Sequence, residues 1–132
     1  MRSYKAFDIV VASQLLEHCY APRNFLCEIH RRVNAGGLLV VASTYAWDAA
    51  VTPREEWLGG DESSASANAN ASEEQAGASA SVSSADAVRA LLTAEGRFVE
   101  LAAEQCDLPF VVREQARKFT HGVAHVMFFE RQ

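Results

Sequence analysis

The stretch that decides the fold is residues 7–43, which reads FDIVVASQLLEHCYAPRNFLCEIHRRVNAGGLLVVAS. Residues 7–12 form an apolar run with no polar alternation after Asp8, which is typical of a parallel strand with both faces covered. Residues 38–43 form a second run of this kind. The residues between the two runs predict a helix, so the stretch predicts a parallel βαβ unit with a right-handed crossover.

The connecting helix is expected over residues 23–33. Pro22 suits a helix start because the N–H that it lacks has no partner there. Asn34 and the glycines after it favour a helix end, since they tolerate a left-handed backbone. At 3.6 residues per turn the apolar side chains share one stripe: Phe25, Leu26, Ile29 and Val33.

Length and charge limit the class of protein. The chain has 132 residues, of which 49% are hydrophobic, and a formal net charge of -5, so one modest globular domain is expected. The negative charge argues against nucleic acid or an anionic membrane as a partner. A cytoplasmic protein is expected, because no signal peptide and no bilayer-spanning apolar stretch is seen.

Residues 61–84 differ from the rest in composition. Ala or Ser occupies fifteen of these twenty-four positions, and no apolar face can be drawn. Such a segment predicts a disordered surface insertion. After it, a helix is expected from Ala85 to a stop at Gly96, followed by strands at 97–105 and 123–129. Residues 1–132 are therefore expected to form one domain that is interrupted at 61–84.

Several features resemble the second half of class I S-adenosylmethionine-dependent methyltransferases. They are the Phe-Asp pair at the first strand, the Leu-Leu-Glu-His turn at 15–18, Pro22, and the Gly-Gly pair before the next strand. The resemblance implies a Rossmann-like α/β fold in which the strands would be the fourth to seventh of seven, the last one antiparallel. The family's glycine-rich cofactor turn has no counterpart here, and no G-x-G-x-x-G occurs. We therefore expect a fragment whose partner is the missing N-terminal half or a larger parent enzyme.

Two further stretches resemble the methyltransferase domain of the ovothiol-biosynthesis enzymes, the mercaptohistidine imidazole-N-methyltransferases. They are YAW at 45–47 with TPREEWLGG at 52–60, and LPFVVRE at 108–114 with RKFTH at 117–121. This resemblance implies methyl transfer from S-adenosylmethionine to a small thiol-imidazole substrate. The alternatives are a methyltransferase of another small molecule and a non-catalytic remnant that serves as an interaction module.

The resemblance also implies site residues. Ser13 and Gln14 would border the cofactor, and His18 follows them in the same motif. Tyr45, Trp47 and Trp57 would border the substrate, where aromatic faces stabilise a sulfonium by about 0.5–2 kcal/mol. Core packing is the competing interpretation for the aromatic residues and for His18.

Two charged positions complete the implied site. Arg113 would hold a substrate carboxylate with its guanidinium fork, unless it forms a surface salt bridge with Glu114 or Glu55. Glu55 would orient the imidazole or accept its proton, although the sequence does not choose between it, Glu56 and Glu114.

A metal site is not expected. Cys19, Cys27 and Cys106 have unrelated spacings, which indicates reduced thiols rather than a disulfide framework. Cys27 and His30 are one helical turn apart, but no second pair with zinc spacing accompanies them.

Overall fold

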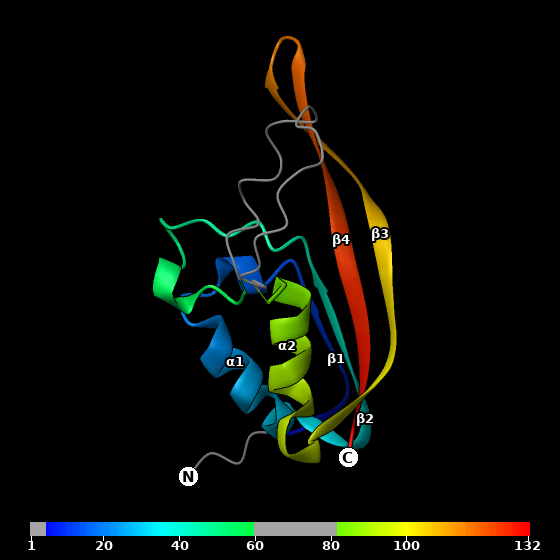
Figure 1. Ribbon diagram of the computed structural model, residues 1–132. Coiled ribbons are helices and arrows are strands. Elements are labelled where there is room, and N and C mark those ends of the chain that lie inside the picture. Colours follow the sequence, from blue (N-terminus) through cyan, green and yellow to red (C-terminus); the bar gives the residue numbers. More distant parts are fainter. Residues whose placement is uncertain (1–4, 60–81) are drawn as a thin grey trace, which may run out of the picture.

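A computed structural model describes residues 5–59 and 82–132; the side chains of residues 108–112, 114 and 119–121 are outside that description. One sheet runs through it in the order β1-β2-β4-β3. β1 and β2 are parallel, and β4 is antiparallel to both of its neighbours (Figure 1). The strands are β1 Phe7–Ser13, β2 Val33–Ser43, β3 Phe98–Gln115 and β4 Lys118–Arg131. The predicted α/β class with an antiparallel last strand is confirmed.

The βαβ unit forms as predicted, with a shorter helix. α1 covers Pro22–Glu28 and is followed by the 3-10 turn η2, Ile29–Arg32. Val33 already belongs to β2 and pairs with Phe7, whereas the regular register runs from Ile9 opposite Leu38 onwards. The irregularity contains Gly37, where a Cβ atom would lie 2.8 Å from the Asn34 carbonyl oxygen and 2.9 Å from that of Asp8. Gly37 therefore allows a close backbone approach that a side chain would block.

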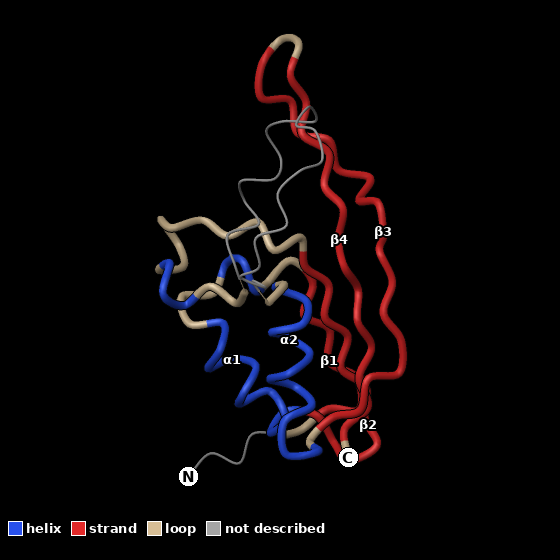
Figure 2. Tube along the Cα trace, viewed as in Figure 1, coloured by secondary structure: helices blue, strands red, loops and turns tan. Residues whose placement is uncertain are grey.

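Both helices lie on the same face of the sheet (Figure 2). α2 covers Ser84–Thr93 and packs beside α1. The core between helices and sheet is made of fully or almost fully buried side chains: Leu16, Leu26, Leu39, Val41, Leu58, Val88, Leu92, Phe98, Met127 and Phe129. The predicted apolar stripe of α1 is largely confirmed, because Leu26 and Ile29 are buried in this core and Phe25 packs against it.

The other face of β1 departs from expectation. Phe7, Ile9 and Val11 are 58%, 64% and 63% exposed, although a strand covered on both faces was predicted. The apolar run fits a doubly covered strand, but the described helices cover one face only, and β2 is the only described strand that pairs with β1. β1 is thus an apolar edge strand with an open face.

β3 and β4 are longer than expected. They stay paired as far as Gln115 and Lys118, beyond the expected limits at residues 105 and 123. A register irregularity lies between Asp107 and Val111, and pairing resumes after it. Figure 1 shows the end of this hairpin extending past the carboxyl ends of β1 and β2.

The predicted insertion at 61–84 is described only at its end, because residues 60–81 lie outside the described part. There α2 begins one residue earlier than expected. The Ser83 hydroxyl caps the helix by accepting a hydrogen bond from the Asp86 N–H, and Ser84 is fully buried. Because the segment is rich in serine throughout, its composition did not single out Ser83 as the residue that caps α2.

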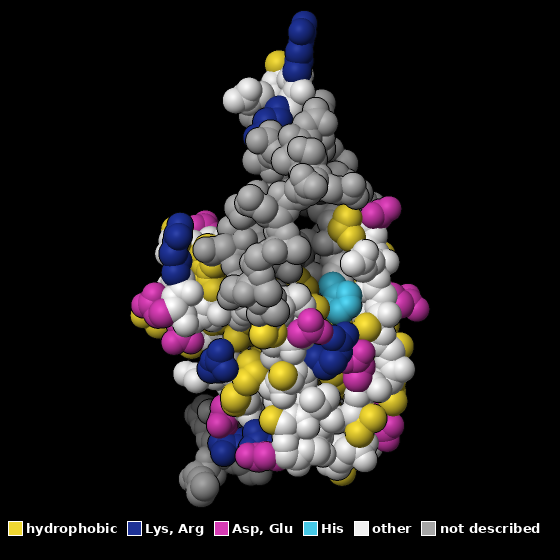
Figure 3. All heavy atoms as spheres, in the orientation of Figure 1, with side chains coloured by type: hydrophobic (Ala, Val, Ile, Leu, Met, Phe, Trp, Pro, Cys, Tyr) yellow, Lys and Arg dark blue, Asp and Glu magenta, His cyan; other side chains and the backbone are white. Residues whose placement is uncertain are grey.

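The surface of the molecule on the side of the two helices carries both basic and acidic side chains. In Figure 3, basic and acidic side chains are intermixed on this face, with hydrophobic groups between them. No helix formed by the described residues has both the length and the apolar character needed to cross a bilayer.

Candidate functional site

Polar residues gather where the two parallel strands end. Ser13, the last residue of β1, lies opposite Ala42 of β2, and the next backbone N–H, that of Gln14, donates to the Ala42 carbonyl at 2.8 Å. Carboxyl ends of adjacent parallel strands are the usual place for a ligand in an α/β sheet. Ser13 and Gln14 thus lie at this edge of the sheet, and their contact with a cofactor stays a prediction.

A buried carboxylate joins the two strand ends. Glu17 belongs to the 3-10 turn η1, Leu16–His18, and is only 4% exposed. Its Oε2 accepts a hydrogen bond from the Ser43 hydroxyl at 2.8 Å, and its Oε1 lies 3.1 Å from the Thr44 hydroxyl. Leu16, which is fully buried, anchors the turn and so directs Glu17 inward. Glu17 therefore fixes the end of β2 against the turn after β1.

Gln14 carries an unsatisfied donor. Its backbone has a φ of 50°, in the left-handed region that non-glycine residues seldom adopt. Its Oε1 lies 3.4 Å from the Thr44 hydroxyl, while its buried Nε2 has no hydrogen-bond partner among the described residues. A buried amide N–H without a partner is costly, and such groups call for an explanation. A ligand acceptor at the end of β1 would satisfy it.

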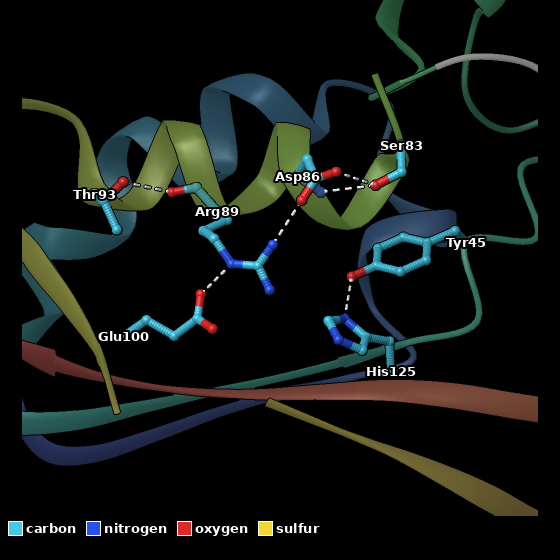
Figure 4. A network of polar contacts seen from close by, with 7 residues as sticks. All are labelled: Tyr45, Ser83, Asp86, Arg89, Thr93, Glu100 and His125. Carbon is cyan, nitrogen blue, oxygen red and sulfur yellow. Dashed lines mark hydrogen bonds and ion pairs between the residues drawn. The ribbon is translucent and has the colours of Figure 1, made fainter. Parts of the chain in front are cut away.

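Tyr45 turns the chain away from β2 and faces β4. Its φ is 54°, it is 9% exposed, and its backbone N–H donates to the Ser43 hydroxyl at 3.0 Å. Its hydroxyl lies 3.3 Å from Nδ1 of His125, and the two rings are tilted by 42° with centroids 6.3 Å apart. Figure 4 shows the pair facing each other above the sheet. A strained backbone that is held in this way is common at functional sites.

A pocket of about 500 Å³ opens beside this pair. Its size is within the range of small-molecule sites. The lining residues come from the end of β2, the start of α2 and the middle of the β3–β4 hairpin: Ser43, Thr44, Tyr45, Ser83, Ala85, Gln105, Val123 and His125. His125 and Gln105, which lie opposite each other in register, were missed by sequence reasoning because neither belongs to a recognisable motif.

A charged cluster stands next to the pocket. Arg89 of α2 pairs with Glu100 of β3 and, at 2.7 Å, with Asp86 (Figure 4). The hydrogen bond to Glu100 is the main cause that raises the pKa of Arg89, with smaller contributions from Asp86 and Tyr45. The guanidinium is therefore a permanent positive charge close to the Tyr45 hydroxyl.

The two tryptophans take part in packing. Trp47 is 6% exposed in the core, and its indole N–H donates to the Ser84 hydroxyl at 3.3 Å. Trp57 is half-buried, donates to the Thr52 carbonyl at 2.9 Å, and has the Arg54 guanidinium 5.5 Å from its ring centroid. Both placements agree with the core-packing interpretation, and their contact with substrate stays a prediction.

The remaining predicted site residues lie apart from the pocket lining. His18 ends η1 and is exposed, and Glu55 is exposed in the 3-10 turn η3, Arg54–Glu56. Arg113 is exposed near the hairpin tip, where its Nε donates to the Gln115 carbonyl at 3.3 Å. Its pairing partner Phe119 is six residues along β4 from His125, the partner of Gln105, so at about 3.3 Å per strand residue Arg113 is on the order of 20 Å from Gln105. Thus the structure does not bring Arg113 to the pocket.

The cysteines and histidines do not form a metal site in the described part of the chain. His30 uses Nδ1 for the Cys27 carbonyl at 2.7 Å. The three cysteines are free thiols. Burial and, to a smaller extent, the negative charge of Glu17 raise the pKa of the Cys19 thiol, which disfavours the thiolate that a metal or a nucleophilic reaction needs.

Comparison with known protein families gives a match over part of the chain. Residues 3–41 match a family model described as a methyltransferase domain. The matched part contains β1, α1 and most of β2; it includes Ser13, Gln14 and Glu17 but ends before Ser43. No curated protein matches the chain. Residues 3–41 are therefore similar to part of a methyltransferase domain, and the mixed sheet is consistent with a partial fold of that kind.

Proposed function

We propose that this methyltransferase-type domain contributes to methyl transfer from S-adenosylmethionine to a small thiol-imidazole substrate, as in ovothiol biosynthesis. The family match supports methyl transfer in general. The finer assignment is supported by the resemblance of residues 45–60 and 108–121 to mercaptohistidine imidazole-N-methyltransferases. The observation that carries the proposal is the group of polar side chains at the adjacent ends of β1 and β2, with its unpartnered buried amide.

The cofactor side is formed by Ser13 and Gln14. The buried Nε2 of Gln14 fits a ligand that presents a hydrogen-bond acceptor at the end of β1. When bound, S-adenosylmethionine supplies an electrophilic methyl group. The role of the chain is to hold the reactants in line and to exclude water. Glu17 supports this by fixing the Ser43 and Thr44 end of the wall.

The substrate side contains Tyr45, which is the predicted aromatic residue that lines the pocket. Trp47 and Trp57 would act mainly by holding the loop after β2 in place. Exposed Glu55 remains a candidate for the proton acceptor, His18 a candidate catalytic residue, and Arg113 a candidate for holding a substrate carboxylate. Glu55 lies in η3 and Arg113 near the hairpin tip, so a substrate in the pocket would meet either of them only if that segment bends towards it.

The open edge of β1 supports a partner. Its exposed apolar side chains would be covered if further strands and helices of the same domain joined the sheet there. We propose that these come from preceding residues of a larger protein or from a separate subunit. The same exposed face favours the alternative function, a non-catalytic module that binds another protein through β1. A methyltransferase of another small molecule is the remaining alternative.

Methyl transfer by a completed domain tests the proposal. Residues 1–132 would be joined to the N-terminal strands of a related methyltransferase and incubated with S-adenosylmethionine that is labelled in its methyl group. Label on an imidazole nitrogen of mercaptohistidine is the expected result. Label only on other small molecules would favour the second methyltransferase alternative. Cofactor binding without any transfer would contradict the catalytic proposal.

A further inference from the structure

His125 brings an imidazole into the pocket at the end of β2. It lies in β4, opposite Ser43 of β2 and Gln105 of β3 in register, and all three residues line the pocket. Its Nδ1 is 3.3 Å from the Tyr45 hydroxyl, and no hydrogen bond joins its Nε2 to a described residue. One ring nitrogen therefore has a protein partner, and the other is left for a ligand.

Tyr45 is held firmly enough to fix the orientation of the imidazole. It is 9% exposed, and its backbone N–H donates to the Ser43 hydroxyl, which in turn donates to buried Glu17. A phenol hydroxyl both donates and accepts hydrogen bonds, so the contact suits either neutral tautomer of His125, and a ligand that presents an N–H to Nε2 selects the tautomer with its hydrogen on Nδ1. If Nε2 then takes up a proton, the phenol oxygen still accepts from Nδ1–H. The pair can thus receive a proton without losing its hydrogen bond.

The charges around the pair are compatible with a positive imidazole. By register and in Figure 4, the titratable and charged groups that face this side of the sheet from neighbouring described elements are Tyr45 after β2, Asp86 and Arg89 of α2, and Glu100 and Asp107 of β3. Arg89 is paired with two of the three carboxylates, so its positive charge is balanced. Nearby carboxylates favour the charged form of an imidazole. A proton on His125 therefore meets no unpaired cation among these groups.

The pocket adjoins the proposed cofactor side through Thr44. This residue lines the pocket, and its hydroxyl is 3.4 Å from Oε1 of Gln14 at the end of β1. Gln14 and Ser13 are the residues of the proposed cofactor side. A substrate ring in the pocket would therefore lie next to that side, within reach of His125.

We propose that His125 is the catalytic proton acceptor for the substrate ring and that Tyr45 is its positioning residue. The inference rests on the proposed function and deepens it, since it assigns the proton to a pocket residue and not to exposed Glu55. The substrate class is an uncharged heteroaromatic ring with two nitrogens. One of them presents an N–H to Nε2 of His125, and the other keeps its lone pair for methylation.

The bonds balance for such a ring. The N–H bond breaks, its electron pair stays on the ring, and the proton binds the Nε2 lone pair, which makes His125 an imidazolium. The other ring nitrogen uses its lone pair to bind the methyl group, whose bond to sulfur breaks and leaves its electrons on the sulfur. Tyr45 accepts from Nδ1–H throughout. The positive charge thus passes from the sulfonium to His125.

Two rings of similar size test the N–H requirement on residues 1–132 without cofactor. Pyrrole presents an N–H, furan has an oxygen in its place, and neither ring titrates near neutral pH. In titrations followed by the ¹⁵N resonances of His125, pyrrole should bind about tenfold more tightly than furan, the effect of one hydrogen bond. When acid protonates His125, Nε2 loses its lone pair and this preference should vanish. Equal binding of the two rings to neutral His125, binding of neither ring, or a pyrrole complex in which Nε2 carries the hydrogen would overturn the inference.

Variants separate the roles of the two side chains. His125→Phe keeps a ring but removes Nε2, so pyrrole should bind as weakly as furan. Tyr45→Phe should weaken the binding of pyrrole and leave that of furan unchanged, whereas a purely structural loss would weaken both alike. His30→Gln, which replaces an imidazole that faces the Cys27 carbonyl, is the matched control and should keep the native preference. A pyrrole preference that survives in His125→Phe would refute the assignment, and if a variant fails to fold, the pH dependence of the native chain still decides.

Methyl transfer by the completed domain gives a second measurement. There His125→Phe should lower kcat on the order of a hundredfold, the usual contribution of a general base, and leave S-adenosylmethionine binding unchanged. Transfer at the native rate would contradict the assignment of His125. If the completed domain transfers no methyl group even with His125 in place, the proposed function fails, whereas the ring titrations on residues 1–132 still decide whether His125 accepts an N–H.

Discussion

The Ser43 hydroxyl donates a hydrogen bond of 2.8 Å to Oε2 of the buried Glu17 side chain. The two residues are 26 positions apart, and their bond ties the turn after β1 to the end of β2. Because Ser43 also accepts the backbone N–H of Tyr45, this one contact sets the path of the chain into the pocket. The polar wall of the site is therefore part of the folded core.

Removal of the Glu17 carboxylate should destabilise the fold. Glu17→Ala leaves the buried Ser43 hydroxyl without its acceptor, which is expected to lower the free energy of unfolding by about 1–3 kcal/mol. Glu17→Gln keeps an acceptor oxygen and should cost less. Urea denaturation followed by circular dichroism measures both. Glu28→Ala, an exposed change on α1, should stay within about 0.5 kcal/mol of the native chain. A Glu17→Ala variant as stable as that control would contradict the role of Glu17.

The exposed face of β1 should make residues 1–132 self-associate. Ile9 and Val11 present apolar side chains beside an unpaired strand edge, which favours pairing with another strand. Ile9→Lys combined with Val11→Lys should shift the chain towards monomer in sedimentation velocity. Leu101→Lys is the matched control, because Leu101 is 55% exposed on β3, at the opposite edge of the sheet. A native chain that is already monomeric, or a control that has the same effect, would contradict an association through β1.

The cysteines should differ in reactivity. The pKa of Cys19 is raised by burial and by Glu17, so at mildly alkaline pH a smaller fraction of this thiol is the reactive thiolate. Iodoacetamide followed by mass spectrometry should therefore label exposed Cys106 before Cys19. Glu17→Gln removes the negative charge and should speed the labelling of Cys19. Faster labelling of Cys19 than of Cys106 in the native chain would show that the sign of the shift is wrong.

Replacement of Gln14 should make the fold more stable and cofactor binding weaker. Gln14→Met keeps the unbranched shape but removes the unpartnered Nε2 donor, so the free energy of unfolding should rise by up to about 1 kcal/mol. In a domain completed at the β1 edge, the same change should weaken S-adenosylmethionine binding. Thermal denaturation and calorimetry measure the two effects. A variant that binds the cofactor as tightly as the native residue would remove Gln14 from the cofactor wall.

The βαβ unit could be predicted because its signals are local. The apolar runs at 7–12 and 38–43, Pro22 and the glycine pair each act within a few residues, and together they identify the parallel pair. The same local signals predicted a helix up to residue 33, whereas α1 ends at Glu28. Val33 is apolar and suits a helix or a strand equally well. One apolar residue such as Val33 fits both the buried stripe of a helix and the buried start of a strand, so it does not show where the helix ends.

The pocket could not be predicted in this way. Tyr45 and His125 are 80 residues apart, and their meeting depends on the register of β4 against β2. The position of Arg113 depends on how far the hairpin continues, which its mixed sequence did not reveal. Trp47 also depends on the folded chain: its indole N–H pairs with Ser84 in the core, as the core-packing interpretation expected, and its contact with substrate stays a prediction.

The most direct test of the account is titration calorimetry with S-adenosylmethionine on two proteins, residues 1–132 alone and the same residues joined to the N-terminal strands of a related domain. β1 is the edge of the described sheet, so the site at its carboxyl end has a wall on one side only. Half a pocket loses most of its affinity. We predict no measurable binding by residues 1–132 and clear binding by the joined protein. Tight binding by residues 1–132, or none by a folded joined protein, would contradict the assignment.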